Sequence, residues 1–102
     1  MAAIQGSDIK NVIVACEAGM GSSVLLTTQM GQRLKPYGVT VEHLAVNRIE
    51  GRPDVVLCHA GLEARARQQA PDSVVLAFNM FLGDPVFDRL ENAIRDDETL
   101  TG

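Results

Sequence analysis

Hydrophobic residues fall in three nearly uninterrupted runs, at 11–15, 54–58 and 73–78. Short runs without polar alternation are typical of strands that are buried on both faces, as in parallel sheets covered by helices. A fourth segment, 39–44, alternates only loosely and is rich in β-branched residues, which predicts a half-exposed edge strand. The pattern therefore predicts four strands, three of them fully buried.

Long apolar side chains recur at every fourth position after the first run, at Leu26, Met30 and Leu34. This spacing lines one face of a helix. Ser22 or Ser23 is a favourable N-cap for that helix, and a proline and a glycine further along end it.

Two further helices and several irregular segments complete the pattern. One helix follows the second buried run, and another begins at Asp84-Pro85, with the aspartate as N-cap and the proline as first helical residue. The connection 45–53 is short for a crossover, so we expect a turn or a single helical turn there. We expect residues 1–9 to be frayed and the acidic segment 96–102 to be disordered.

Strands and helices in this order predict an α/β three-layer sandwich, in which a four-stranded parallel sheet has helices on both faces. Right-handed crossovers give the spatial strand order 2-1-3-4. The length of 102 residues fits a single domain, residues 1–102, with an ordered core over about 9–95. Ligands of such sheets bind at the carboxyl ends of the strands, near the switch in strand order. The loop after residue 15 would lie there.

Composition excludes several classes of protein. The net charge is −4, and no basic stripe is present, which argues against nucleic acid as a partner. No apolar run is long enough to span a membrane and no secretory signal is visible, so we expect a cytoplasmic chain without direct membrane insertion. The two cysteines, Cys16 and Cys58, form no Cys-x-x-Cys pair. We expect reduced thiols, no metal, no other cofactor and a monomeric state.

The segment 16–23 joins the first buried strand to the first helix. Amides at a helix N-terminus bind anions, and the same field favours the thiolate, which is the nucleophilic form of cysteine. We therefore expect Cys16 to carry a phosphoryl group that the backbone amides of the following loop hold. The other residues of this phosphate-binding loop are Glu17, Ala18, Gly19, Met20, Gly21, Ser22 and Ser23.

Two other kinds of phosphate site fit the loop less well. A nucleotide P-loop needs a lysine after its last glycine, but Ser22 follows Gly21. Low-molecular-weight tyrosine phosphatases, which have a similar fold, use a Cys-x5-Arg loop and an Asp-Pro acid loop. The sixth residue after Cys16 is Ser22, and Asp84-Pro85 is better explained as a helix start. A cysteine phosphatase is therefore a less favoured function.

The Cys-Glu-Ala-Gly-Met-Gly-Ser-Ser sequence at 16–23 closely resembles the active-site loop of enzyme IIB domains of bacterial phosphoenolpyruvate-dependent sugar phosphotransferase systems, specifically the mannitol type. These domains belong to a superfamily with a lactose/cellobiose-like IIB fold. The resemblance continues at 54–59 and 79–90 and covers most of residues 10–95. Ala60 and Gly61 depart from it, since polar or charged residues are usual at these positions.

The resemblance implies a role in phosphoryl relay. Cys16 would accept a phosphoryl group from a phosphohistidine of a IIA protein. It would then pass the group to a sugar, mannitol or a related hexitol, while the membrane transporter IIC imports that sugar. The alternative is a regulatory IIB-like domain that is phosphorylated on Cys16 without sugar transfer.

Three further residues have chemically active side chains. His59, at the end of a buried strand, is either an accessory contact near the phosphoryl group or a hydrogen-bonding residue of the strand end. His43, on the edge strand, is expected to be simply exposed. Cys58 is expected to fill the core. Because neighbouring strands are about 4.8 Å apart, a working hypothesis is that mild oxidation links Cys16 to Cys58 and blocks phosphorylation.

Overall fold

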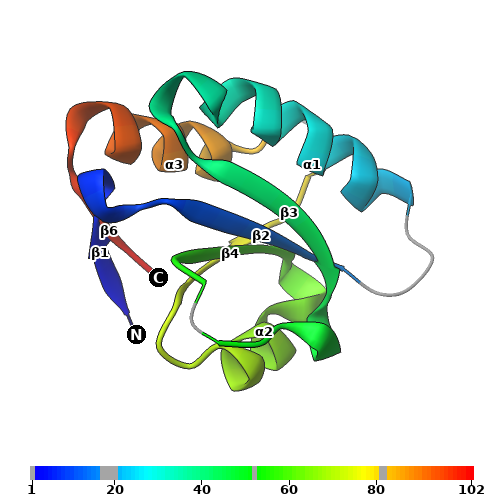
Figure 1. Ribbon diagram of the computed structural model, residues 1–102. Helices are drawn as coiled ribbons and strands as arrows, with labels where there is room; N and C mark the ends of the chain where they lie inside the picture. Colours follow the sequence, from blue (N-terminus) through cyan, green and yellow to red (C-terminus); the bar gives the residue numbers. More distant parts are fainter. Residues whose placement is uncertain (1, 17–20, 52, 81–82) are drawn as a thin grey trace.

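A four-stranded parallel sheet with helices on both faces forms the centre of the molecule (Figure 1). The structure, a computed structural model, describes residues 2–16, 21–51, 53–80 and 83–102. The strands are β2 (Asn11–Cys16), β3 (Thr40–Ala45), β4 (Val55–His59) and β5 (Val74–Phe78). They lie in the spatial order β3-β2-β4-β5, so the predicted α/β fold and its strand order 2-1-3-4 are confirmed.

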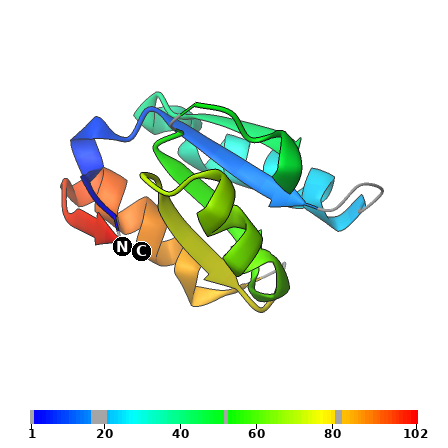
Figure 2. The same ribbon diagram turned by 90° about the horizontal axis from the view of Figure 1, so that it is seen from below.

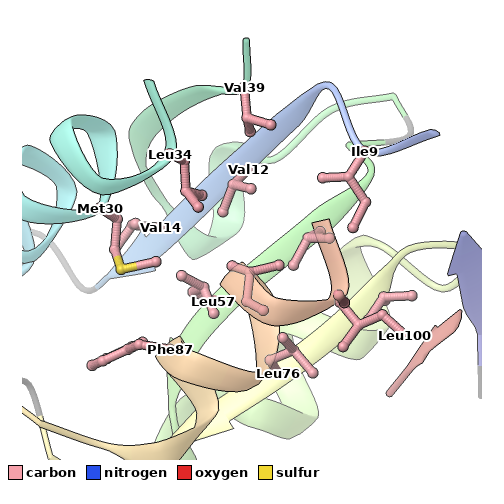
Figure 3. Close-up of a cluster of buried hydrophobic side chains, with 14 of the residues drawn as sticks. Ile9, Val12, Val14, Met30, Leu34, Val39, Leu57, Leu76, Phe87 and Leu100 are labelled. Atoms are coloured by element: carbon pink, nitrogen blue, oxygen red, sulfur yellow. The ribbon is translucent and has the colours of Figure 1, made fainter. Parts of the chain in front are cut away.

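Side chains of the central strands alternate between two apolar layers. On one face, the even-numbered residues of β2 and the odd-numbered residues of β4 pack against α1 (Gly21–Leu34) and α3 (Pro85–Asp96), as Figure 3 shows. On the other face, Ile13, Ala15 and Cys58 pack against α2 (Glu63–Gln69) and its neighbours. Burial on both faces explains the uninterrupted apolar runs of the sequence.

The helix boundaries differ slightly from the predicted ones. α1 begins at Gly21, so Ser22 and Ser23 lie in its first turn instead of preceding it. It ends at Leu34 and passes into a 3-10 turn, η2 (Lys35–Tyr37), as the sequence indicates. The short connection between β3 and β4 contains one 3-10 turn, η3 (Val46–Arg48), which confirms the expected single turn. Another 3-10 turn, η4 (Ala60–Leu62), leads into α2.

Residues 2–9 and 96–102 are part of the fold, so the predicted fraying of 1–9 is wrong for its described residues and the predicted disorder of 96–102 is wrong. β1 (Ala3–Gln5) pairs antiparallel with β6 (Thr99–Thr101), and a 3-10 turn, η1 (Gly6–Asp8), leads into the main sheet. The two ends lie side by side in Figure 2, and Ala2 and Gly102 exchange backbone hydrogen bonds of 3.1 and 3.0 Å. The apolar side chain of Leu100 secures this small sheet to the core, where it is 1% exposed.

Candidate functional site

Cys16 is the last residue of β2, at the point where the strand order of the sheet reverses. β2 lies between β3 and β4. The chain therefore continues from β2 to β3 on one side, and then crosses back to form β4 on the opposite side of β2. Such a switch point is where ligands bind in open α/β sheets. The N-terminus of α1 follows at the same edge, beginning at Gly21. The loop residues Glu17, Ala18, Gly19 and Met20 lie outside the described residues.

His43 contacts the sulfur of Cys16, although the sequence assigns it no role. β2 and β3 are parallel, and Val14 pairs with His43. The His43 side chain therefore leaves the same face of the sheet as Cys16, and its Nε2 lies 2.9 Å from Cys16 Sγ. His43 is exposed, as predicted, whereas Cys16 is only 3% exposed. An isolated histidine on a loosely alternating strand gave no signal of this contact.

His59 is the last residue of β4, the strand on the other side of β2. Val14 pairs with Leu57, so strand alternation puts the side chain of His59 on the same face of the sheet as that of Cys16. The Nδ1 atom of His59 accepts a hydrogen bond of 3.2 Å from the amide of Gly61. Its ring stacks edge-on against Phe78, with 6.0 Å between ring centroids. The strand-end hydrogen bond predicted for His59 is present, and the pairing of β4 with β2 ends at Leu57, two residues before His59.

Cys58 is a core residue, as predicted, but its orientation contradicts a disulfide with Cys16. The Cys58 side chain packs with Ala15 in the α2 layer, whereas Cys16 and His43 lie on the opposite face. A disulfide needs the two Cβ atoms to point towards each other, so the oxidation hypothesis is wrong for the folded chain. Burial raises the pKa of the Cys58 thiol to about 11, which keeps it protonated and unreactive.

Asp84 is the N-cap of α3, as predicted. Its Oδ1 accepts a hydrogen bond of 3.0 Å from the amide of Val86, and its Oδ2 accepts bonds of 2.9 and 3.3 Å from the amides of Asn79 and Met80. These amides, that of Val86 above all, lower the pKa of the Asp84 carboxyl group. A carboxylate held in its charged form is a poor proton donor, which argues against a role as the acid of a phosphatase.

The described residues contain no group of three or more histidine, cysteine or acidic side chains arranged to bind a metal ion. Nor does any helix in this part of the chain have the length and apolar character needed to cross a membrane. Among the described residues at the carboxyl end of β2, the contact that could carry chemistry is therefore that between the Cys16 thiol and the His43 imidazole.

Comparison with known proteins identifies a family and several relatives that match most of this chain. Residues 11–87 match the family model described as "PTS system, Lactose/Cellobiose specific IIB subunit". The chain is 35% identical over 89 residues to the "PTS system mannitol-specific EIICBA component" of Vibrio cholerae, which covers 85% of this chain and 14% of that protein. It is 34% identical over 90 residues to the "PTS system mannitol-specific cryptic EIICB component" of Escherichia coli K12, covering 86% of this chain and 19% of that protein.

A third relative is the "PTS system mannitol-specific EIICB component" of Halalkalibacterium halodurans, 28% identical over 93 residues, covering 89% of this chain. The chain spans less than a quarter of the length of these relatives, at 14%, 19% and 20%. The family match covers all four strands of the main sheet together with α1, α2 and the start of α3. The chain therefore belongs to the IIB family of the bacterial sugar phosphotransferase systems, whose members are phosphocarrier domains.

Proposed function

We propose that Cys16 is the phosphoryl acceptor of this IIB domain and that residues 1–102 act as one phosphocarrier unit. The observation that carries the proposal is the position of Cys16, at the carboxyl end of a central strand, with four residues between it and the start of α1. Phosphoryl transfer depends mainly on positioning and charge stabilisation. In the proposed arrangement the loop after Cys16 brings the N-terminal amides of α1 to the phosphoryl oxygens, because amides at a helix N-terminus bind anions.

The donor in this proposal is a phosphohistidine of a IIA protein. The Cys16 thiolate attacks the phosphorus atom, the S–P bond forms and the N–P bond to the donor imidazole breaks. The donor imidazole then takes up a proton. In the second transfer a sugar hydroxyl attacks the phosphorus atom and releases its proton to solvent. The S–P bond breaks, and Cys16 keeps the electron pair as a thiolate. The backbone amides of Glu17, Ala18, Gly19, Met20, Gly21, Ser22 and Ser23 hold the phosphoryl oxygens between these transfers.

Exposed apolar side chains support docking of partner proteins at this edge. Val24 and Leu25 are each 54% exposed in the first turns of α1, and Met80 is 52% exposed just after β5. Large exposed apolar side chains are typical of protein interaction sites where they form a patch, and we propose that these three do so. We propose that a IIA protein and the membrane transporter IIC use this edge in turn. The EIICB relatives, whose name combines the IIC and IIB letters, support the IIC partner.

We propose mannitol or a related hexitol as the sugar. The relatives are named mannitol-specific, whereas the family description names lactose and cellobiose. The relatives that match most of this chain are the better guide to the sugar, since a family description covers members of several specificities. A panel of mannitol, other hexitols, lactose and cellobiose, offered to IIC-containing membranes with this chain, distinguishes these substrates.

The experiment supplies the purified chain with phosphoenolpyruvate, the general phosphorelay proteins and a cognate IIA. We expect mass spectrometry to find one phosphoryl group, on Cys16, and none on Cys16→Ser. Cys58→Ala is the matched control, because its thiol is buried on the other face of the sheet, and we expect it to be phosphorylated normally. Undiminished phosphorylation of Cys16→Ser would refute the proposal. Phosphorylation of Cys16 without transfer to any sugar would favour a regulatory domain.

A further inference from the structure

The contact between Cys16 and His43 gives the thiol a partner that can take its proton. Cys16 Sγ lies 2.9 Å from Nε2 of His43 and 3.5 Å from the carbonyl oxygen of Leu44. A thiol has a single proton and cannot donate it to both. The shorter contact is to the imidazole nitrogen, which accepts the proton from the thiol or, once protonated, donates it back to the thiolate.

The two side chains of this contact differ in their exposure to solvent. Cys16 is 3% exposed, so its sulfur has little direct access to water, whereas the His43 side chain is exposed. An imidazole can exchange protons with water near neutral pH. His43 therefore connects the buried sulfur to solvent, and a proton that leaves Cys16 has a route out of the fold.

Few other charges in the described structure compete for the His43 imidazole. Glu42, its neighbour on β3, pairs in register with Ile13 and lies on the opposite face of the sheet. The segment 21–34, which packs on β3 as α1, contains only one ionisable residue, Arg33. Arg33 is itself bound to Asp88 and Glu91 of α3. On β2, the ionisable side chain is Cys16 itself.

We propose, resting on the phosphocarrier function above, that His43 is the general base for phosphorylation of Cys16 and then the counterion of the phosphocysteine. The Sγ proton moves to Nε2 of His43, which leaves a thiolate beside an imidazolium. The thiolate attacks the incoming phosphorus atom, the S–P bond forms, the N–P bond of the donor breaks, and the donor imidazole takes a proton from solvent. The His43 imidazolium remains beside the negatively charged phosphoryl group.

The proton held on Nε2 of His43 is used again in the transfer to the sugar. When a sugar hydroxyl attacks the phosphocysteine, the hydroxyl proton leaves to solvent, the S–P bond breaks, and the electron pair returns to the sulfur. The resulting thiolate is stabilised by the imidazolium and can regain its proton from Nε2. His43 is thus a catalytic residue in both transfers, since it touches the reacting sulfur atom in each.

The first test measures the initial rate of phosphorylation of Cys16 by the phosphorylated IIA protein. His43→Gln keeps a polar side chain without a titrating nitrogen, and His43→Phe keeps a ring without one. We expect both to lower the rate about 100-fold, the lower end of the range typical of general base catalysis. Glu42→Gln, one residue away on the other face of the sheet, is the control that should keep the wild-type rate. Wild-type rates in both His43 variants would overturn the proposal.

The second test needs no partner protein. The rate of Cys16 alkylation by iodoacetamide is measured against pH, with peptide mapping to confirm the labelled residue. We expect no label on Cys58, because it packs in the layer of α2, where burial raises the pKa of its thiol to about 11. We expect both His43 variants to react more slowly than wild type near pH 7 and to have profiles displaced to higher pH. Superimposable profiles would overturn the proposed proton transfer. Circular dichroism and thermal melts confirm that these exposed-site variants remain folded.

The two tests separate failure of this proposal from failure of the relay. If wild-type Cys16 is phosphorylated and the His43 variants match it, the His43 role is refuted and the relay stands. If wild-type Cys16 is never phosphorylated but the alkylation profiles differ as expected, the relay is refuted and the thiol–imidazole proton transfer is supported.

Discussion

The side chain of Leu100 tests whether the C-terminal segment is part of the folded core. Leu100 is 1% exposed and belongs to the same apolar cluster as Leu57 and Leu90. Truncating a fully buried leucine to alanine costs about 2–5 kcal/mol, because transfer free energy is lost and a cavity is left. We therefore expect Leu100→Ala to lower the free energy of unfolding by about 2–5 kcal/mol, which corresponds to a fall in Tm of roughly 8 °C or more.

The assay is urea denaturation followed by circular dichroism, with Thr101→Ala as the matched control. Thr101 follows Leu100 on β6 but is exposed, and the carbonyl oxygen by which it accepts a hydrogen bond of 2.8 Å from Arg89 is retained in the variant. We expect Thr101→Ala to change stability by about 0.5 kcal/mol or less. If Leu100→Ala cost no more than Thr101→Ala, the segment 99–101 would not be packed as described, and the original expectation of a disordered tail would be correct.

The remaining predictions concern stability elsewhere in the fold. Asp84→Ala should cost about 1 kcal/mol through loss of the α3 N-cap, and Asp84→Asn less, because an amide oxygen still caps the helix. Since the pKa of Asp84 is lowered in the folded state, its charge stabilises the protein above about pH 3.9, the usual unfolded value, and this stabilisation is lost as the pH falls through the folded pKa. The stability difference between wild type and Asp84→Asn should accordingly shrink between pH 7 and pH 3 in denaturation experiments; a constant difference would refute the role of the charge. Gly6→Ala should destabilise by about 1–3 kcal/mol, because a Cβ there would lie 1.8 Å from the carbonyl oxygen of Ala93. Gly31→Ala, where a Cβ meets no atom within 4 Å, should stabilise α1 by about 0.5–1 kcal/mol; equal thermal melts of these two variants would contradict both predictions.

The central architecture could be predicted from sequence because its signals are local. Each buried strand is a run of five or six residues with apolar side chains on both faces, and the Asp84-Pro85 pair marks the start of a helix. The strand order follows from the handedness of the crossovers. The position of Cys16 at the carboxyl end of β2 follows from these features together, since it comes directly after the first run.

The remaining features depend on contacts between residues far apart in the sequence. β1 and β6 have three residues each, too few for a recognisable alternation, and their partners lie at opposite ends of the chain. The contact between His43 and Cys16 depends on the register of β3 against β2, because a shift of one residue would turn His43 to the other face. The orientation of Cys58 away from Cys16 depends on the same kind of register, between β2 and β4.

The identity of the phosphorylated atom tests the central claim most directly. Cys16 lies beside His43, so a phosphoryl group at this edge could be linked to sulfur or to nitrogen. The measurement is the 31P NMR spectrum of the chain after phosphorylation through IIA. We expect a sulfur-linked phosphoryl resonance that is absent from Cys16→Ser. A nitrogen-linked resonance that persists in Cys16→Ser would contradict the assignment of Cys16 as the phosphoryl carrier.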